Sequence, residues 1–339
     1  MTHDNASAAA TAMLHLATGV WMSQAIYAAA KLGLADLLRN GPLLCRTLAA
    51  ATNTNPGALY RLLRALASAD IFAEEDDAVF RLTPRAECLL SGVPGSLRAF
   101  AIMLGEEEHW QSWGKVLYSV ETGQPAFDHV FGMPQFSYFA AHPRAARVFD
   151  EAMTSRSGQE NEAIIAAYDF SKFQCVVDVG GGEGTLLRLL LKVTPTVRAV
   201  LFDMPHVIES ARAAWGRDAT RIEFKHGNFF DKVPTGGDAY ILKRVIHDWD
   251  DERALTILKN CRKAMHPGAR LFLIEPIIPP GNCASFNKLL DLLMLVWTSG
   301  GKERTAAEHS ALLVAAGFEL VHLVPTNSYL GIIEATPEQ

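Results

Sequence analysis

A glycine-rich stretch at residues 174–187, QCVVDVGGGEGTLL, constrains the fold of this chain more than any other feature. The short apolar run Cys175–Val177 is typical of a buried parallel strand. Four glycines follow within seven residues, and then a leucine-rich helical pattern begins. Glycine permits a tight turn behind a strand and lets a ligand lie against bare backbone. The stretch therefore predicts an open α/β sheet with a nucleotide-type site at the carboxyl end of its first strand.

The spacing of the glycines argues against a dinucleotide. A dinucleotide fingerprint has the form G-x-G-x-x-G and binds a pyrophosphate at the helix N-terminus. Here the spacing is G-x-G-x-G from Gly180 to Gly184, Thr185 replaces the third glycine, and Glu183 would oppose a pyrophosphate. S-adenosylmethionine (SAM), which has a cationic centre and no phosphate, suits this turn. Asp203 ends the next apolar run, where an acid can bind ribose hydroxyls. The alternative is a structural turn beside a strand-terminal aspartate.

Composition limits the class of protein. The chain has 339 residues, 49% of them hydrophobic, which is enough for two domains with sizeable cores. A net charge of −6 argues against general nucleic-acid binding. The five cysteines show no metal-binding spacing, so we expect reduced thiols and no metal. There is no signal-peptide pattern and no apolar run long enough to span a membrane, so we expect a cytoplasmic protein.

Residues 1–98 are expected to form a winged-helix domain. Ala8–Leu38 is helical territory with more apolar surface than a small domain covers, which indicates a subunit interface. Two short helices, around Thr47–Ala51 and from Pro56 onward, precede a hairpin that ends in Val79–Thr83. The turn of this hairpin, Glu74–Asp77, is acidic and would repel DNA phosphates. We therefore favour dimerisation over DNA binding.

Residues 99–168 show no strand pattern and are rich in aromatic residues and methionines. Such side chains form core or line a pocket for a flat organic substrate. We expect this helical segment to bind the acceptor, with Met103 and Trp110 among the residues involved.

The remainder, residues 169–339, alternates strands with helices, as βαβ units do. The expected strands after the glycine turn are Arg198–Asp203, Ile222–His226, Asp238–Val245 and Arg270–Glu275, followed by a closing hairpin, Phe318–Val324 with Tyr329–Ala335. This pattern predicts a Rossmann-like, seven-stranded methyltransferase sheet, parallel except for its last strand.

Polar side chains follow several of these strands, at the edge where open α/β sheets bind ligands. His247 is a candidate general base, because a neutral imidazole can take a hydroxyl proton near neutral pH. Its other ring nitrogen needs an acceptor, and Glu275 and Glu303 are both suitable. Asn228 could bind an adenine edge and Phe229 its face. Each of these residues could instead be structural.

Together these motifs resemble the SAM-dependent class I O-methyltransferases of the plant caffeic-acid and bacterial natural-product type, a group that includes phenazine- and polyketide-methylating enzymes. The likeness spans nearly the whole chain. It is carried by Val177–Gly182, Phe202–Val207, Gly227–Phe230, Lys243–Trp249, Ile274-Glu275 and Gly300–Thr305.

The resemblance implies a homodimer formed through the N-terminal domain. It places Gly180 against the cofactor, Asp203 on its ribose, Asn228 and Phe229 on its adenine, and Lys243 near its amino-acid part. It makes His247 the general base, flanked by Glu275 and Glu303. We also expect Ser157 to bind cofactor. The acceptor-binding residues expected in addition to Met103 and Trp110 are Phe149, Met153, Asp248, Met294 and Thr298.

Two positions depart from the family pattern. The family usually has aspartate where this chain has Asn228, which keeps one acceptor for adenine and predicts somewhat weaker binding. Trp297-Thr298 stands where plant members have smaller or amide side chains, so phenylpropanoid substrates are not expected.

The sequence thus predicts an O-methyltransferase that acts on a phenolic or enolic hydroxyl of a small aromatic secondary metabolite, with S-adenosylhomocysteine as the second product. The alternatives are N- or C-methylation, a SAM-assisted rearrangement or decarboxylation, a winged-helix regulator, and a nicotinamide dehydrogenase.

Overall fold

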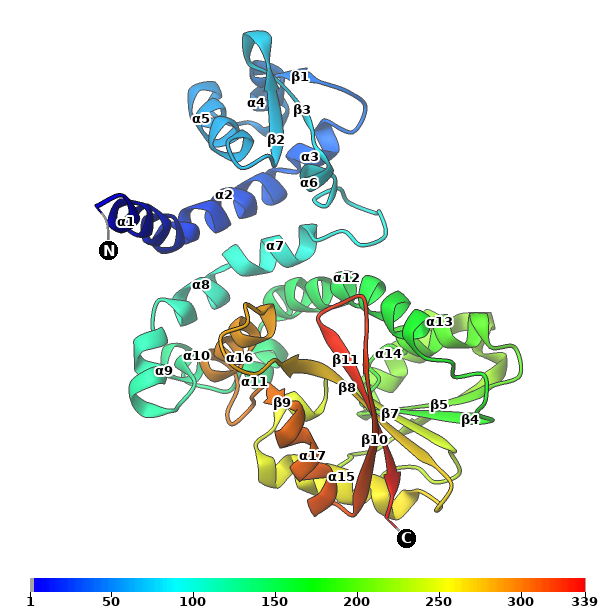
Figure 1. Ribbon diagram of the computed structural model, residues 1–339. Coiled ribbons are helices and arrows are strands. Elements are labelled where there is room, and N and C mark those ends of the chain that lie inside the picture. Colours follow the sequence, from blue (N-terminus) through cyan, green and yellow to red (C-terminus); the bar gives the residue numbers. More distant parts are fainter. Residues whose placement is uncertain (1–2, 339) are drawn as a thin grey trace. The chain divides into compact units, whose positions relative to one another are not determined.

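The computed structural model describes residues 3–338 (Figure 1). The chain divides into two compact units. The first comprises Met1–Gln111 and Phe139–Arg156, and the second comprises Ser112–Tyr138 and Ser157–Gln339. The chain passes between the units three times, within α8 (Glu107–Trp113), α11 (Gln135–Ala141) and the long helix α12 (Pro143–Ala167).

The first unit has the helix, turn, helix and hairpin that the sequence predicts. Its helices are α1 (His3–Ala17), α2 (Gly19–Leu32), α3 (Leu34–Leu37), α4 (Cys45–Thr52), α5 (Pro56–Ala67), α6 (Pro84–Glu87), α7 (Arg98–Gly105) and α8 (Glu107–Trp113). The wing consists of β2 (Phe72–Glu75) and β3 (Val79–Leu82), joined by the 3₁₀ turn η1 (Asp76–Ala78), with β1 (Leu43–Leu44) on the other side of β3. Asn55 caps α5 by accepting the Ala58 N–H at 3.0 Å, and Pro56 occupies its first turn.

Between residues 98 and 167 the chain is helical. After α7 and α8 come α9 (Val116–Thr122), α10 (Ala126–Phe131), α11 (Gln135–Ala141) and α12. In the second unit the ring of Phe127 on α10 packs against Tyr138 and against Trp297, at centroid distances of 5.5 and 5.4 Å.

The second unit contains the predicted sheet. Its strands are β4 (Cys175–Val179), β5 (Arg198–Asp203), β6 (Ile222–His226), β7 (Ala239–Lys243), β8 (Arg270–Ile278), β10 (Phe318–Pro325) and β11 (Leu330–Pro337), with the short β9 (Arg304–Thr305) beside β8. The strand order is β10-β11-β8-β7-β4-β5-β6. Only the last strand, β11, runs antiparallel to its neighbours β8 and β10, which confirms the methyltransferase-type sheet. Figure 1 shows the β10–β11 hairpin in red.

Helices cover both faces of this sheet. Alternate residues of a strand point to opposite faces: Val177 and Val179 of β4 pack with the core under α15 (Asp251–Ala264) and α17 (Ala306–Ala315). Val176 packs with α12, α13 (Thr185–Val193) and α14 (Pro205–Trp215). α16 (Phe286–Trp297) follows β8, and η2 (Gly216–Arg221) follows α14. Within the described range, residues 3–338, no helix has the length and apolarity needed to cross a membrane.

Candidate active site

The glycine turn follows β4 and closes on Asp203. Gly180, Gly182 and Gly184 have positive φ angles of 72°, 59° and 73°, which side chains disfavour. The Gly182 N–H donates to Oδ2 of Asp203 at 2.8 Å. A Cβ on Gly180 would lie 2.9 Å from Val245 and 3.6 Å from the Phe229 ring. Gly180 is therefore closely packed against residues that follow β6 and β7, and a side chain there would collide with Val245. Helix α13 begins at Thr185, so the exposed Glu183, expected at the helix start, precedes it by two residues.

The residues expected to bind ribose and adenine lie beside this turn. Asp203 also accepts the Met204 N–H at 2.7 Å. Burial raises the pKa of Asp203, although these two backbone hydrogen bonds lower it. Oδ1 of Asn228 accepts the Phe230 N–H at 3.0 Å, so its single acceptor oxygen is already shared with the backbone.

A buried charge network holds Lys243 at the end of β7. Its Nζ lies 3.0 Å from Oε2 of Glu160 and 2.7 Å from Oδ1 of Asn161, both on α12. Tyr329 donates to Glu160 as well, and Arg244 lies 3.7 Å from it. Burial raises the pKa of Glu160, but the charges of Arg244 and Lys243 outweigh it and hold the pKa at about 2.

Sequence reasoning missed Glu160 and Asn161. The available signal was helical periodicity: Glu160 lies four residues before the buried Ile164, so a charged side chain occupies the apolar face of α12. The expected strand through Val245 also stops earlier, because Arg244 adopts a positive φ of 54° and turns the chain out of the sheet after Lys243.

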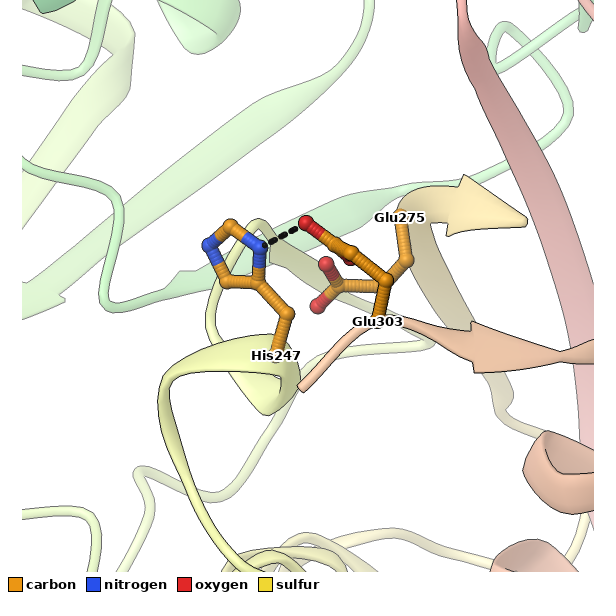
Figure 2. Close-up of side chains that lie close together, drawn as sticks. All are labelled: His247, Glu275 and Glu303. Atoms are coloured by element: carbon orange, nitrogen blue, oxygen red, sulfur yellow. Dashed lines mark hydrogen bonds and ion pairs between the residues drawn. The ribbon is translucent and has the colours of Figure 1, made fainter. Parts of the chain in front are cut away.

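His247 lies in the short 3₁₀ turn η3 (Ile246–Asp248) that follows. Its side chain is buried, and Nδ1 lies 2.9 Å from Oε1 of Glu303 (Figure 2). Because a carboxylate only accepts, this contact places a proton on Nδ1. Nε2 faces the other way, 3.5 Å from Oδ1 of Asp248. The turn thus orients one ring nitrogen toward Glu303 and the other toward Asp248.

Glu275 lies in the same cluster but has a different task. Its Oε1 accepts the backbone N–H groups of Val245 and Ile246 at 3.0 and 2.9 Å. Burial raises the pKa of Glu275 to about 7, against the lowering effect of His247. The structure therefore brings both predicted glutamates to His247, with Glu303 on the ring and Glu275 on the backbone of the turn.

The charges around His247 favour its protonated form. Burial lowers the pKa of His247, but the carboxylates of Asp248, Glu303 and Glu275 outweigh burial and raise this pKa above its ordinary value. Ligand atoms of His247, Glu275 and Glu303 lie within 4.8 Å of one another, a spacing that a metal ion could also bridge.

Three of the predicted acceptor-binding residues lie near this cluster. Asp248 belongs to η3 itself, and its Oδ1 lies 3.5 Å from Nε2 of His247. Met294 is buried on α16, and Thr298, just after the helix, donates its hydroxyl to the Met294 carbonyl at 2.7 Å. Ser157 lies on α12 in the second unit. The other predicted residues, Met103 on α7, Trp110 on α8, and Phe149 and Met153 on α12, belong to the first unit. Their contact with an acceptor stays a prediction.

Comparisons with known proteins decide the family. The family models for an O-methyltransferase domain and for an O-methyltransferase dimerisation domain match residues 113–319 and 14–92. The chain belongs to the O-methyltransferase family. It is 44% identical to the phenazine O-methyltransferase PhzM of Lysobacter antibioticus, over 99% of this chain and 100% of that protein. It is 38% identical to an 8-amino-8-demethylriboflavin N,N-dimethyltransferase of Streptomyces davaonensis, over 91% and 90%.

A solved structure agrees with this assignment. Human N-acetylserotonin methyltransferase in complex with SAM matches with a TM-score of 0.89 and 27% identity, covering 98% of each chain. The resemblance expected from the sequence motifs is therefore confirmed, and the protein is a SAM-dependent O-methyltransferase of the natural-product type. The regulator and dehydrogenase alternatives lose their support.

Proposed function

We propose that this O-methyltransferase methylates a phenolic or enolic hydroxyl of a small aromatic acceptor, with His247 as the general base. The observation that carries the proposal is the buried contact of 2.9 Å between Nδ1 of His247 and Glu303. It fixes the ring and presents Nε2 as the atom that can accept a proton.

The residues around the glycine turn fit SAM. Among the described residues, Oδ1 of the buried Asp178 has no hydrogen-bond partner, and a Cβ on Gly181 would lie 2.6 Å from this carboxylate. Acidic side chains at the turn suit a cationic ligand and would repel a pyrophosphate. Gly180 would contact the cofactor, Asp203 its ribose, Asn228 and Phe229 its adenine, and Lys243 and Ser157 its amino-acid part. Bound there, SAM supplies an electrophilic methyl group.

The protein's own residues then move one proton. Nε2 of His247 would accept the hydroxyl proton of the acceptor, so that the acceptor oxygen could take the methyl group as its bond to sulfur breaks, with S-adenosylhomocysteine as the leaving group. The carboxylate of Glu303 stabilises the imidazolium that forms. Positioning two reactants in one site supplies most of the acceleration, and the base adds about 10²–10⁴-fold. No step needs a metal ion, and we propose that none is bound.

The acceptor class rests on the relatives and on the aromatic segments. A phenazine O-methyltransferase is 44% identical over essentially the full chain. We therefore propose a fused aromatic acceptor such as a hydroxyphenazine. Candidate contacts are Met103, Trp110, Phe149, Met153, Asp248, Met294 and Thr298.

N-methylation is the second candidate, because relatives include a riboflavin-type N,N-dimethyltransferase. The two are separated by incubating the enzyme with SAM and matched pairs of hydroxyl- and amino-substituted phenazines and naphthoates, followed by mass spectrometry. Methylation of the hydroxyl compounds supports the proposal. Methylation of the amino compounds alone would overturn it.

We further propose that the enzyme is a homodimer formed through an N-terminal domain of residues 1–98, with residues 99–168 as the acceptor segment and 169–339 as the cofactor domain. The matched dimerisation domain supports this. So does a set of exposed apolar side chains on α1 and α2, namely Met13, Leu14, Leu16, Val20 and Trp21. Sedimentation should show a dimer, and Leu16→Glu with Trp21→Glu should dissociate it. A wild-type monomer would contradict the proposal.

A further inference from the structure

The turn that carries His247 depends on residues outside it for its shape. It is one turn of 3₁₀ helix, Ile246–Asp248, between β7 and α15. Such a short turn satisfies few of its own carbonyl groups, and buried carbonyls need partners. Where these partners lie therefore determines where the imidazole points.

Arg304 supplies partners on both sides of His247. Its side chain is fully buried. Nη1 donates to the carbonyl of Ile246 at 3.1 Å, and Nη2 donates to the carbonyl of Trp249 at 2.8 Å. The guanidinium thus bridges the residue before His247 and the second residue after it. A planar group with fixed donor directions can hold two carbonyls in one geometry, which a lysine cannot do.

Asp251, the first residue of α15, fixes the guanidinium in turn. Its Oδ1 accepts from Nε and Nη2 of Arg304 at 3.0 and 2.7 Å. The Asp251 side chain is 56% exposed, so solvent weakens this ion pair and its contribution to stability is small. The geometry it imposes on Arg304 is its main consequence.

The residues next to Arg304 contact the same turn. The Lys302 N–H donates to the carbonyl of His247 at 2.9 Å. Gly301 has room only for hydrogen, because a Cβ there would lie 2.8 Å from the carbonyl oxygen of His247. Between Lys302 and Arg304, Glu303 contacts Nδ1 of the imidazole ring, as Figure 2 shows. One short segment, Gly301–Arg304, therefore holds both the imidazole and the backbone that carries it.

We propose that Arg304 is a positioning residue for the methyl-transfer step: it fixes the backbone on both sides of His247 and so aims Nε2 at the acceptor hydroxyl. This inference rests on the proposed role of His247 as the base. A displacement of about 1 Å at a reacting group can cost roughly 10²-fold in rate. Loss of the two hydrogen bonds from the guanidinium to the carbonyls of Ile246 and Trp249 should therefore lower kcat and leave cofactor binding intact.

The test is Arg304→Lys, which keeps the positive charge but removes the planar guanidinium that donates to both carbonyls. We expect kcat to fall about 10- to 100-fold, with the dissociation constant for SAM and the acid limb of the pH–kcat profile unchanged. The matched control is Arg221→Lys. Arg221 also donates to three backbone carbonyls of the second unit, those of Leu191, Thr194 and Val197, which lie outside the site. An Arg304→Lys variant with wild-type kcat would overturn the inference.

A double-mutant cycle separates this role from general destabilisation. If Arg304 acts through His247, the variant carrying both His247→Ala and Arg304→Lys turns over no more slowly than His247→Ala alone. If the kcat of the double variant instead falls by the product of the two single losses, the inference is overturned. If His247→Ala itself keeps full turnover, the proposed base is wrong; if only Arg304→Lys is silent, the base stands and the positioning role fails.

A second variant keeps the test decisive if Arg304→Lys does not fold. Asp251→Ala leaves Arg304 on its two carbonyls but removes the carboxylate that fixes the guanidinium. We expect a loss of several-fold in kcat at unchanged SAM affinity. Wild-type kcat in a folded Asp251→Ala variant would then count against the inference.

Discussion

Oε1 of Glu303 lies 2.9 Å from Nδ1 of His247, whereas the same atom of Glu275 accepts the backbone N–H groups of Val245 and Ile246. Two buried glutamates therefore act on different parts of the segment that carries His247. Glu303 orients the ring and favours its protonated form, and Glu275 holds the backbone from which the ring extends.

This division predicts unequal effects of neutralising the two acids. Glu303→Gln removes the charge beside the imidazolium, so we expect kcat to fall about 10- to 100-fold. Glu275→Gln keeps an oxygen that can accept both backbone N–H groups, so its loss should be clearly smaller. Steady-state kinetics on both variants, with thermal unfolding as a check on folding, measure the difference. Equal losses would show that the two glutamates are interchangeable.

The surrounding carboxylates also predict a pH dependence. They raise the pKa of His247, and an imidazolium cannot accept a proton. The value of kcat/KM for the acceptor should therefore rise with pH through an apparent pKa above the ordinary 6.5 of histidine. Glu303→Gln removes a negative charge, lowers this pKa and should shift the limb to lower pH.

Two acceptors whose hydroxyl groups differ in acidity provide the control for this profile. A limb that belongs to His247 stays in place when the acceptor changes. A limb that follows the acidity of the acceptor would assign the titration to the substrate instead.

We expect the substitution Asn228→Asp to increase the affinity for SAM. Its one acceptor oxygen is shared with the Phe230 N–H. Asn228→Asp adds a second acceptor that can bind the adenine amino group while the first keeps the backbone contact. One additional hydrogen bond of about 1 kcal/mol would tighten SAM binding roughly 5-fold. Isothermal titration calorimetry measures this directly, and weaker or unchanged binding would remove Asn228 from the adenine site.

Chelation tests the proposal that no metal takes part. His247, Glu275 and Glu303 could bridge an ion, but two of their ligand atoms already bond to each other across 2.9 Å. Dialysis against EDTA should leave kcat within error of the untreated enzyme, and added Zn²⁺ should not raise it. Loss of turnover that Zn²⁺ or Mg²⁺ restores would require a metal-assisted reaction.

The sequence was sufficient for the architecture because that information is local. The apolar run Cys175–Val177 and the glycines behind it predict β4 and its turn, and the strands Arg198–Asp203 and Ile222–His226 match residue for residue. Periodicity and turn chemistry determine such elements within a few residues of sequence.

The division of work within the site could not be predicted in this way. Glu275 lies within β8 and Glu303 directly precedes β9. Which of them reaches the ring depends on the backbone of η3 and on the segment Gly301–Arg304, which is distant from His247 in sequence. Arg304 gave no signal of its own role, because its partners are carbonyl groups, which every residue carries. Glu160 lies on a helix and is buried there against Lys243, which is more than 80 residues away in sequence.

Turnover of His247→Ala at saturating SAM tests whether His247 is the general base. The acceptor is the compound methylated fastest in the hydroxyphenazine and naphthoate panel, and His266→Ala, at an exposed histidine of the same unit, is the control. We predict that His247→Ala binds SAM with an affinity within about 2-fold of wild type and loses about 10²–10⁴-fold in kcat, while His266→Ala keeps both. A His247→Ala enzyme that binds SAM and methylates the hydroxyl at a rate close to wild type would show that His247 is not the base.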